Sequence, residues 1–377
     1  MKREVYLYQN NIWDKELDTT LDSKNSLIIC FGSSDFNKVE NGLKEITNKF
    51  KQSIIIGCST SGEIYQDRLY DGVLSVVIIK FDKTKLKLNI SKIDDMDKSY
   101  EIGSNIANDL YNENLKSVFI LCDGLNVNGT RLTKGISKIF EDKVIVTGGL
   151  AGDGEKFHKT WLIVDDKAQT NYITCVGFYG DDINIAYGSQ GGWKEFGKER
   201  ITTKAHNNIL YELDGEPALE VYKRYLGDEA NDLPASGLLY PLEIIEENSK
   251  DIKVRAILSI DEKTQSIGFA ADIPQNTKVK FMRASFNQLI DGAKRSAHDI
   301  SFDDYKGQDA VNIAVSCAGR RIVLGQKTED ELEAVFDNFG QNVKQIGFYS
   351  YGEISPLSNG ICDFQNQTMT LTFIWEN

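Results

Sequence analysis

The sequence contains no long hydrophobic run, which argues against a helix that crosses a membrane. The best candidate, residues 73–81, is far shorter than the roughly 20 apolar residues that such a helix needs, and it contains Lys80. The chain starts with Met1-Lys2-Arg3-Glu4 and continues without the apolar core of a signal peptide. We therefore expect a cytoplasmic protein that has no membrane partner.

Paired metal-binding motifs are also missing. The six cysteines form no CxxC pair, so zinc-ribbon and thioredoxin-like motifs are excluded. The three histidines show no HxxxH or other metal-ligand spacing, and no Walker or dinucleotide-binding glycine motif occurs. The sequence therefore predicts no metal bound by side chains alone, and the scattered cysteines are typical of small buried apolar residues.

Clusters of positive charge are absent as well. The formal net charge is −13, and Arg320-Arg321 is a lone basic pair. Nucleic acids and anionic membrane surfaces both require groups of lysine or arginine, so we exclude both as partners. A chain of 377 residues exceeds the usual size of one hydrophobic core, which predicts two domains.

What the sequence does have is a glycine turn that occurs three times. Residues 57–63 read GCSTSGE, residues 347–353 read GFYSYGE, and residues 148–153 form a weaker copy, GGLAGD. Each follows a short apolar run typical of a buried strand. Glycine permits backbone angles closed to other residues and lets a ligand approach the main chain. The acid at the end of each turn then lies at the carboxyl end of a strand, where open α/β sheets bind ligands.

The same order of predicted elements surrounds each turn. An apolar strand is followed by a helix with one apolar face, a second strand, the glycine turn and a β-hairpin. The opening strands end at Cys30, Cys122 and Cys317, and each cysteine precedes the later glycine of its turn by a similar number of residues. We interpret this as an internal repeat that builds an α/β fold with mixed sheets.

The predicted domain boundary lies in a charged, glycine-containing segment, Gly227 to Asp232, which has the composition of a linker. We therefore divide the chain into an N-terminal extension (residues 1–26), a first domain (27–227) with two repeat units, and a second domain (228–377) with one.

Several motifs in a fixed order resemble the FIST family, in which a FIST N domain precedes a FIST C domain. The resemblance runs from about residue 27 to the end of the chain. The residues that carry it are 57–63, 148–153, Gly192-Trp193, 211–218 with Tyr222, 316–320, 347–356 and 366–368.

The resemblance implies a sensory protein that binds a small ligand, with amino acids as the suspected class. Some members are described as haem-binding nitric oxide sensors, which leaves haem as an alternative ligand. The chain carries no output domain, so we expect it to signal to a separate histidine kinase, cyclic-dinucleotide enzyme or chemoreceptor. It departs from the family at Gln365, where we expect a histidine before Asn366.

The turn acids and one arginine form the predicted ligand site. Glu63, Asp153 and Glu353 could receive an ammonium group, and Arg320 presents a planar donor fork suited to a carboxylate. Alternatively, each acid accepts backbone N–H bonds within its own turn, and Arg320 pairs with one of them. Glu353 with Arg320 is the preferred pair. The turn residues Ser61, Gly62, Gly152 and Gly352 and the polar Asn366 complete the predicted site.

Aromatic residues flank this site. Tyr349 and Tyr351 face one side if the strand continues through them, and then form either a pocket wall or part of the core. Trp193 is interpreted as a loop anchor rather than a lid.

Two further residues are candidates for other functions, a thiol enzyme and a haem protein. Cys317 is a candidate nucleophile, but no histidine stands in a recognisable partner motif, so we favour a structural thiol and a protein that is not an enzyme. His158 is the candidate axial ligand in the haem alternative. We expect the ligand pocket near the domain boundary, where ligand contacts from both halves favour one relative orientation.

Overall fold

A computed structural model describes residues 1–246, 251–302 and 305–377. It confirms the α/β fold with mixed sheets and the predicted repeat. In each of three units, a strand pairs in parallel with the strand that follows its helix, and a third strand pairs with the first in antiparallel. A fourth strand, which precedes the others in sequence, completes the outer side of each sheet.

The elements of the three units are as follows. Unit 1 contains β1 (Lys2–Gln9), β2 (Ile12–Trp13), β3 (Ser26–Ser33), α1 (Glu40–Lys49), β4 (Ile54–Thr60), β5 (Glu63–Tyr65), β6 (Arg68–Tyr70) and β7 (Leu74–Lys80). Unit 2 contains β8 (Lys85–Lys92), α2 (Ser99–Leu110), β9 (Leu115–Cys122), α3 (Gly129–Phe140), β10 (Ile145–Leu150), β11 (Leu162–Val164), β12 (Lys167–Gln169) and β13 (Tyr172–Tyr179). Unit 3 contains β14 (Ile183–Gln190), α5 (Phe286–His298), β23 (Ala310–Cys317), α6 (Ala318–Leu324), α7 (Thr328–Phe336), β24 (Val343–Ser350), β25 (Glu353–Pro356), β26 (Cys362–Gln365) and β27 (Met369–Glu376).

The hairpin of each unit joins the sheet of another unit. The β5–β6 hairpin of unit 1 pairs with β24, the β11–β12 hairpin of unit 2 pairs with β4, and the β25–β26 hairpin of unit 3 pairs with β10. This cyclic exchange links unit 1 to 3, 2 to 1 and 3 to 2. The segments 27–227 and 228–377 are therefore interleaved in space.

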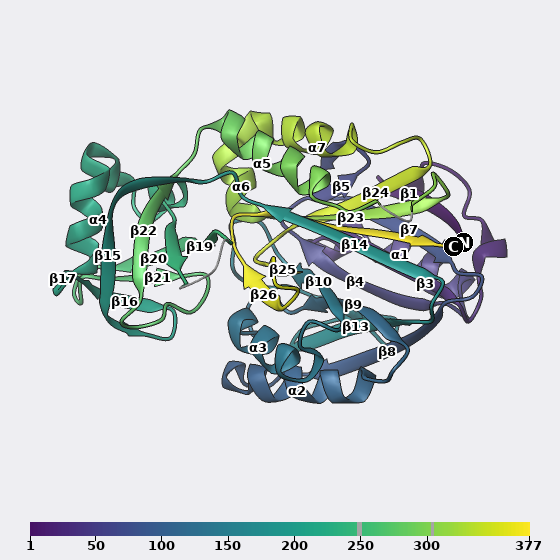
Figure 1. Cartoon of the computed structure of the whole chain (residues 1–377). Coiled ribbons are helices and arrows are strands. Elements are labelled where there is room, and N and C mark those ends of the chain that lie inside the picture. Colours follow the sequence, from purple (N-terminus) through teal and green to yellow (C-terminus); the bar gives the residue numbers. More distant parts are fainter. Residues whose placement is uncertain (247–250, 303–304) are drawn as a thin grey trace.

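The three sheets enclose one apolar core. Side chains from all three meet there, including the stacked rings of Phe31 and Phe348, whose centroids are 4.6 Å apart. The helices cover the outer faces: α1 packs on unit 1, α2 and α3 on unit 2, and α5 and α7 on unit 3. In Figure 1, α5 and α7 lie above the sheets, α2 and α3 lie below them, and the two chain termini lie side by side.

The first glycine of each turn motif is required by close packing of neighbouring strands. A Cβ on Gly57, Gly148 or Gly347 would lie 2.3, 1.8 or 1.9 Å from a carbonyl oxygen of the adjacent parallel strand. The register on these glycines shows that Cys30, Ile120 and Ala314 are equivalent. The cysteines that suggested the repeat are therefore not at equivalent positions, although the strands are.

A separate β-rich subdomain is inserted in unit 3, between β14 and α5 (Figure 1). It has its own apolar core. The boundary predicted after residue 227 falls inside it, where α4 is followed by a 3-10 helix, Gly227–Asp232. Its elements are β15 (Lys194–His206), β16 (Ile209–Leu213), β17 (Glu216–Pro217), α4 (Ala218–Leu226), β18 (Leu242–Ile245), β19 (Lys253–Arg255), β20 (Ile257–Asp261), β21 (Ser266–Phe269) and β22 (Lys278–Arg283).

The predicted N-terminal extension is part of the first unit. Its strand β1 pairs with β7 from Lys2 to Tyr8, so residues 1–26 complete a sheet. Within the residues that the structure describes, no helix is long and apolar enough to cross a membrane.

Candidate functional site

The three glycine turns meet at the centre of the molecule and are joined by equivalent main-chain hydrogen bonds. The N–H of Ser61 donates to the carbonyl of Tyr349 at 2.8 Å, and Gly152 donates to Ser59 at 3.0 Å. The third bond, from Tyr351 to the carbonyl of Leu150, measures 3.2 Å. Each unit therefore donates one bond to the next. The predicted turn residues therefore come together in one hydrogen-bonded cluster rather than in separate sites.

Two of the turn acids are fully buried within this cluster of turns. Glu353 accepts hydrogen bonds from the Ser350 hydroxyl at 2.7 Å and from the N–H and hydroxyl of Thr368 at 3.2 and 2.9 Å. Burial raises the pKa of Glu353 to about 8, although these bonds and the charge of Arg320 oppose the shift. Glu63 has a matching environment, and burial raises its pKa to about 7. Neither glutamate lines either of the two cavities described below. Each is held by a hydroxyl of its own turn and by the backbone N–H of a residue beyond the turn, Val73 or Thr368, so the alternative of backbone bonds within the turn describes them only in part.

The acid of unit 2 has a different role. Asp153 accepts the backbone N–H groups of Phe157, His158 and Lys159 at 2.8–2.9 Å, together with the hydroxyl of Tyr351. Burial raises its pKa, but these donors outweigh that effect and the pKa is lowered overall. Asp153 therefore holds the 154–159 loop in place as a carboxylate, and its own oxygens are taken up by that loop.

Arg320 is not available to a ligand carboxylate. It is completely buried, and its Nη2 and Nε lie 2.7 and 3.1 Å from Glu331 on α7. Its remaining N–H groups donate to the carbonyls of Gly191, Leu289 and Gln367. The predicted receptor pair of Arg320 with Glu353 is therefore not assembled around a cavity. Arg320 instead ties α6, α7, α5 and the end of β14 together.

An open cavity of about 480 Å³ lies directly above the joined turns. Its floor is formed by the carboxyl ends of β10, β23 and β24, at Leu150, Cys317 and Ser350. The start of α3 forms one wall. The inserted subdomain forms the roof through residues 234–238, 256–258 and 269–272. The cavity thus lies between the three-sheet body and the subdomain, close to the predicted domain boundary.

Asn366, which lines this mainly apolar cavity, has one unpaired polar atom. Asn366 is 1% exposed, and its Oδ1 accepts no hydrogen bond from the described residues, while its Nδ2 donates to the Gln365 carbonyl at 2.9 Å. An unpaired buried carbonyl oxygen costs about 1–3 kcal/mol. Asn366, a predicted site residue, therefore combines a place in the cavity lining with an unmet hydrogen-bond acceptor.

The remaining polar groups come from α3 and from the roof. Asn128 begins α3 by accepting the Arg131 N–H, and its Nδ2 donates to Asp272 of the roof at 3.0 Å. Asn208 donates to the Phe269 carbonyl at 2.8 Å. None of the described residues that line the cavity is lysine or arginine, whereas Asp272 and Glu155 are acidic. The cavity therefore favours a neutral or cationic ligand with an apolar body.

The two predicted tyrosines do not share a face. Tyr351 lines the cavity, and its ring stacks on Phe157 with centroids 4.6 Å apart. Tyr349 is the penultimate residue of β24, outside the cavity lining, and its hydroxyl donates to Glu331 in the core beneath α7. Only Tyr351 forms a pocket wall. Trp193 is the expected anchor: it is buried, and its indole N–H donates to the Gln367 carbonyl at 3.0 Å.

Cys317 lines the cavity, but burial raises the pKa of its thiol to about 12. His158 is exposed and lies outside the cavity lining, as do His206 and His298. An axial histidine is therefore absent from the described lining, and these residues do not fit the haem alternative. Among the described residues, no group of three or more histidine, cysteine or acidic side chains is arranged to hold a metal ion.

Sequence reasoning missed Asn128, Asp272 and the apolar roof. Asn128 was recognisable, because an asparagine before an apolar helix is a common N-cap and this one follows the opening strand of a repeat unit. The roof carries no such signal, because residues 234–272 belong to no repeat.

Comparison with known proteins finds two family models that together match most of the chain. A model of the FIST N domain matches residues 26–216, and a model of the FIST C domain matches residues 218–356. An uncharacterized protein of Methanocaldococcus jannaschii is 25% identical, over 89% of this chain and 71% of its own length. The crystal structure of a cyanuric acid hydrolase from A. caulinodans aligns with all of this chain and 99% of its own, at 8% identity and a TM-score of 0.37. A score this low supports no conclusion about function.

Proposed function

This chain belongs to the FIST family of small-ligand sensory domains, and we propose that its ligand binds in the cavity beneath the inserted subdomain. The observation that carries the proposal is the unpaired Oδ1 of Asn366, a residue in the lining of a mainly apolar cavity of about 480 Å³. Sites for small molecules are typically apolar pockets that contain a few well-placed polar groups. We propose that the protein works by binding and not by turnover, and that it acts in the cytoplasm.

The ligand we propose is a small amine or an amino acid with an apolar side chain. Its ammonium group donates to Asn366 and faces the acidic Asp272, while its apolar body contacts Tyr351, Leu238 and Phe269. No cation of the lining matches a carboxylate, so the carboxylate of an amino acid faces the open mouth of the cavity. The ammonium, rather than the carboxylate, then determines affinity.

Signalling follows from the position of the cavity between two bodies. Polar contacts join the subdomain to the body on both sides of the cavity. Beside α3 and the floor they are Asn128 with Asp272 at 3.0 Å, Gln367 with the Leu238 carbonyl at 3.3 Å, and Arg131 with Asn207 at 2.8 Å. Beside the β25–β26 hairpin they are Lys253 with Asp363 at 2.5 Å, Arg255 with the Phe364 carbonyl at 3.3 Å, and Ser358 with Asp251 at 2.7 Å. A ligand that contacts floor and roof together stabilises one orientation of the subdomain. A separate signalling protein, such as a histidine kinase, a cyclic-dinucleotide enzyme or a chemoreceptor, then reads that orientation.

Thermal unfolding tests the proposal. Leucine, isopentylamine and 4-methylpentanoate share the same branched five-carbon unit, and the last two lack the carboxylate and the ammonium respectively. We expect leucine-type amino acids and the amine to raise Tm and the acid to leave it unchanged. A ligand at 100 times its Kd adds about 2.7 kcal/mol of stability. The same comparison is made with valine, methionine and phenylalanine and their corresponding amines.

Asn366→Leu removes the unpaired acceptor and should abolish the shift, whereas Asn108→Ala, on the exposed face of α2, should preserve it. A panel in which no compound shifts Tm would refute the proposed site. A shift produced equally by the amine and the acid would refute the ammonium-based recognition.

A further inference from the structure

The free edge of β14 differs from the other sheet edges of the molecule. The four described sheets have eight terminal strands, and six of these contain only two to five residues. The exceptions are β8 and β14, with eight residues each. Short edge strands are a common protection against pairing with other chains, so these two long edges need another explanation.

Charge protects β8 but not β14. The β8 strand, KLKLNISK, carries three lysines, which oppose the addition of another strand. The β14 strand, INIAYGSQ, contains no charged residue. The equivalent strand of unit 1, β1, is partly covered by β2. The equivalent strands of the three units therefore differ at their outer edges: β1 is partly covered, β8 carries lysines, and only β14 is both long and uncharged.

The main chain of β14 offers hydrogen bonds at this edge. Asp182 accepts the N–H of Asn377 at 2.9 Å, and these two residues are directly opposite in the β14–β27 register. Bonded pairs alternate along an antiparallel ladder. The N–H and C=O groups of residues 183, 185, 187 and 189 therefore point away from β27, and no described residue pairs with them.

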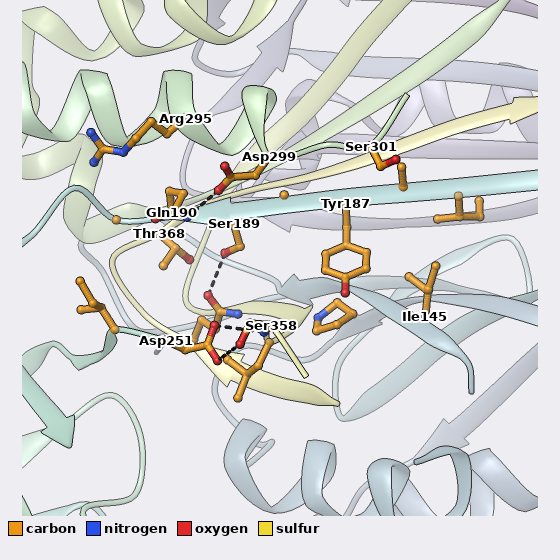
Figure 2. Close-up of a pocket in the computed structure, with 18 of the residues that line it drawn as sticks. Ile145, Tyr187, Ser189, Gln190, Asp251, Arg295, Asp299, Ser301, Ser358 and Thr368 are labelled. Carbon is orange, nitrogen blue, oxygen red and sulfur yellow. Dashed lines mark hydrogen bonds between the residues drawn. The ribbon is translucent and has the colours of Figure 1, made fainter. Parts of the chain in front are cut away.

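A groove of about 1230 Å³ runs along this edge, from Ile183 to Lys194. Figure 2 shows Tyr187 and Ser189 pointing to one side of β14, while Arg295 and Asp299 lie on the other side. The far wall includes Ile145 and Leu357. Eight residues of strand extend about 26 Å, so the groove accommodates a peptide in extended conformation.

The groove has unpaired positive charge at the carboxyl end of β14. Lys194 and Arg295 both line it, and neither is within ion-pair distance of a carboxylate of the described residues. Asp299, which also lines this end, accepts a bond from Gln190 at 2.5 Å. Two unpaired cations on a chain with a net charge of −13 provide a local site for an acidic side chain.

We propose that the free edge of β14 docks an extended segment of a partner protein, which adds to the sheet as a further strand. The segment places uncharged residues along β14 and an acidic residue beside Lys194 and Arg295. Main-chain bonds to an exposed edge supply the affinity in this mode of recognition, and flanking side-chain contacts supply the specificity. The identification of this partner as the signalling output rests on the proposed function, but strand addition itself requires no cavity ligand.

A random dodecamer library displayed on phage provides the probe, and the best clone is synthesised with a fluorescent label. We expect an acidic residue next to an uncharged run rich in β-branched residues. N-methylation of the synthetic peptide at alternate residues tests strand pairing directly. Methylation in one phase should weaken binding about tenfold or more, because the N–H groups bonded to β14 are lost, and methylation in the other phase should have little effect.

Protein variants test the location. Tyr187→Pro removes an outward N–H without touching the β27 ladder and should weaken binding, whereas Tyr187→Ala, which keeps that N–H, should bind. Arg295→Glu should weaken binding about tenfold, and Lys294→Glu, its exposed neighbour on α5, should not. The proposal is overturned if no peptide is selected, or if N-methylation at the two sets of alternate residues weakens binding equally. It is also overturned if Tyr187→Pro and Arg295→Glu bind the peptide as well as the parent protein does. A protein dimer that Tyr187→Pro dissociates would also overturn it, because a second copy would then occupy the edge.

These experiments are performed without added ligand. Loss of peptide binding therefore leaves the proposed cavity site intact, and an absence of Tm shifts with amines leaves the edge proposal intact.

Discussion

Glu63 and Glu353 occupy the same position in two of the three repeats and make the same contacts. Each carboxylate binds the hydroxyl of the residue three positions earlier, Thr60 or Ser350. Each also accepts the N–H of the residue that precedes the last strand of its unit, Val73 or Thr368. A motif that suggested a ligand site is therefore a device that closes a turn onto its own sheet.

These two glutamates make the stability of the protein depend on pH. Their native pKa values of about 7 and about 8 lie above the ordinary value of 4.5. Between pH 4.5 and 8, the native state therefore binds more protons than the unfolded state. The free energy of unfolding should fall as pH rises through this window, by about 1.4 kcal/mol per pH unit for each proton retained.

Glu353→Gln should remove part of this slope. The amide oxygen keeps an acceptor for the N–H and hydroxyl of Thr368, but the side chain does not ionise. Urea denaturation at pH 5, 6, 7 and 8 measures the slope. The exposed Glu101→Gln is the control and should keep the parental slope. An unchanged slope in Glu353→Gln would show that this carboxyl is ionised in the native protein at neutral pH.

The loop that walls the cavity should depend on Asp153. Asp153→Ala removes the acceptor for three backbone N–H groups and for Tyr351. Each bond to a charged acceptor contributes about 1.5–3 kcal/mol, so we expect a substantial local loss of stability. Hydrogen exchange should accelerate at the amides of Phe157, His158 and Lys159 and remain slow in β23. Uniform acceleration throughout the chain would instead indicate a global role for this carboxylate.

Arg320 should act on stability rather than on ligand recognition. Arg320→Ala leaves Glu331 buried without its partner, which typically costs about 3–5 kcal/mol. The double variant Arg320→Met with Glu331→Leu should recover much of this loss, because a buried pair replaced by apolar side chains is often close to neutral. Thermal unfolding measures both variants. A double variant that folds but no longer responds to amines or amino acids would show that Arg320 contributes to binding.

The sequence predicted what local chemistry encodes and missed what depends on distant pairing. The repeat was recognisable because strand, helix and glycine turn each leave a short pattern. The exchange of hairpins was not recognisable, because the sequence of β5 does not reveal whether this strand pairs with β24 or with a strand of its own sheet. Arg320 was misassigned for a similar reason. An arginine that follows a strand-end glycine has the same local sequence whether it pairs with a buried acid such as Glu331 or binds a ligand. Asn366 and Tyr351 do line the cavity.

Cys317 provides a final test, which separates a binding protein from a thiol enzyme. Cys317 lines the cavity, but burial raises the pKa of its thiol to about 12, so the reactive thiolate is scarce at neutral pH. Iodoacetamide at pH 7.5 should label it far more slowly than a free thiol of pKa about 8.5. Peptide mass mapping distinguishes it from the other five buried cysteines. Cys317→Ser should retain the Tm shift with amines, because the proposed anchor is Asn366. Rapid labelling of native Cys317 would instead require a nearby base that activates it, and would favour nucleophilic chemistry at the floor of the cavity.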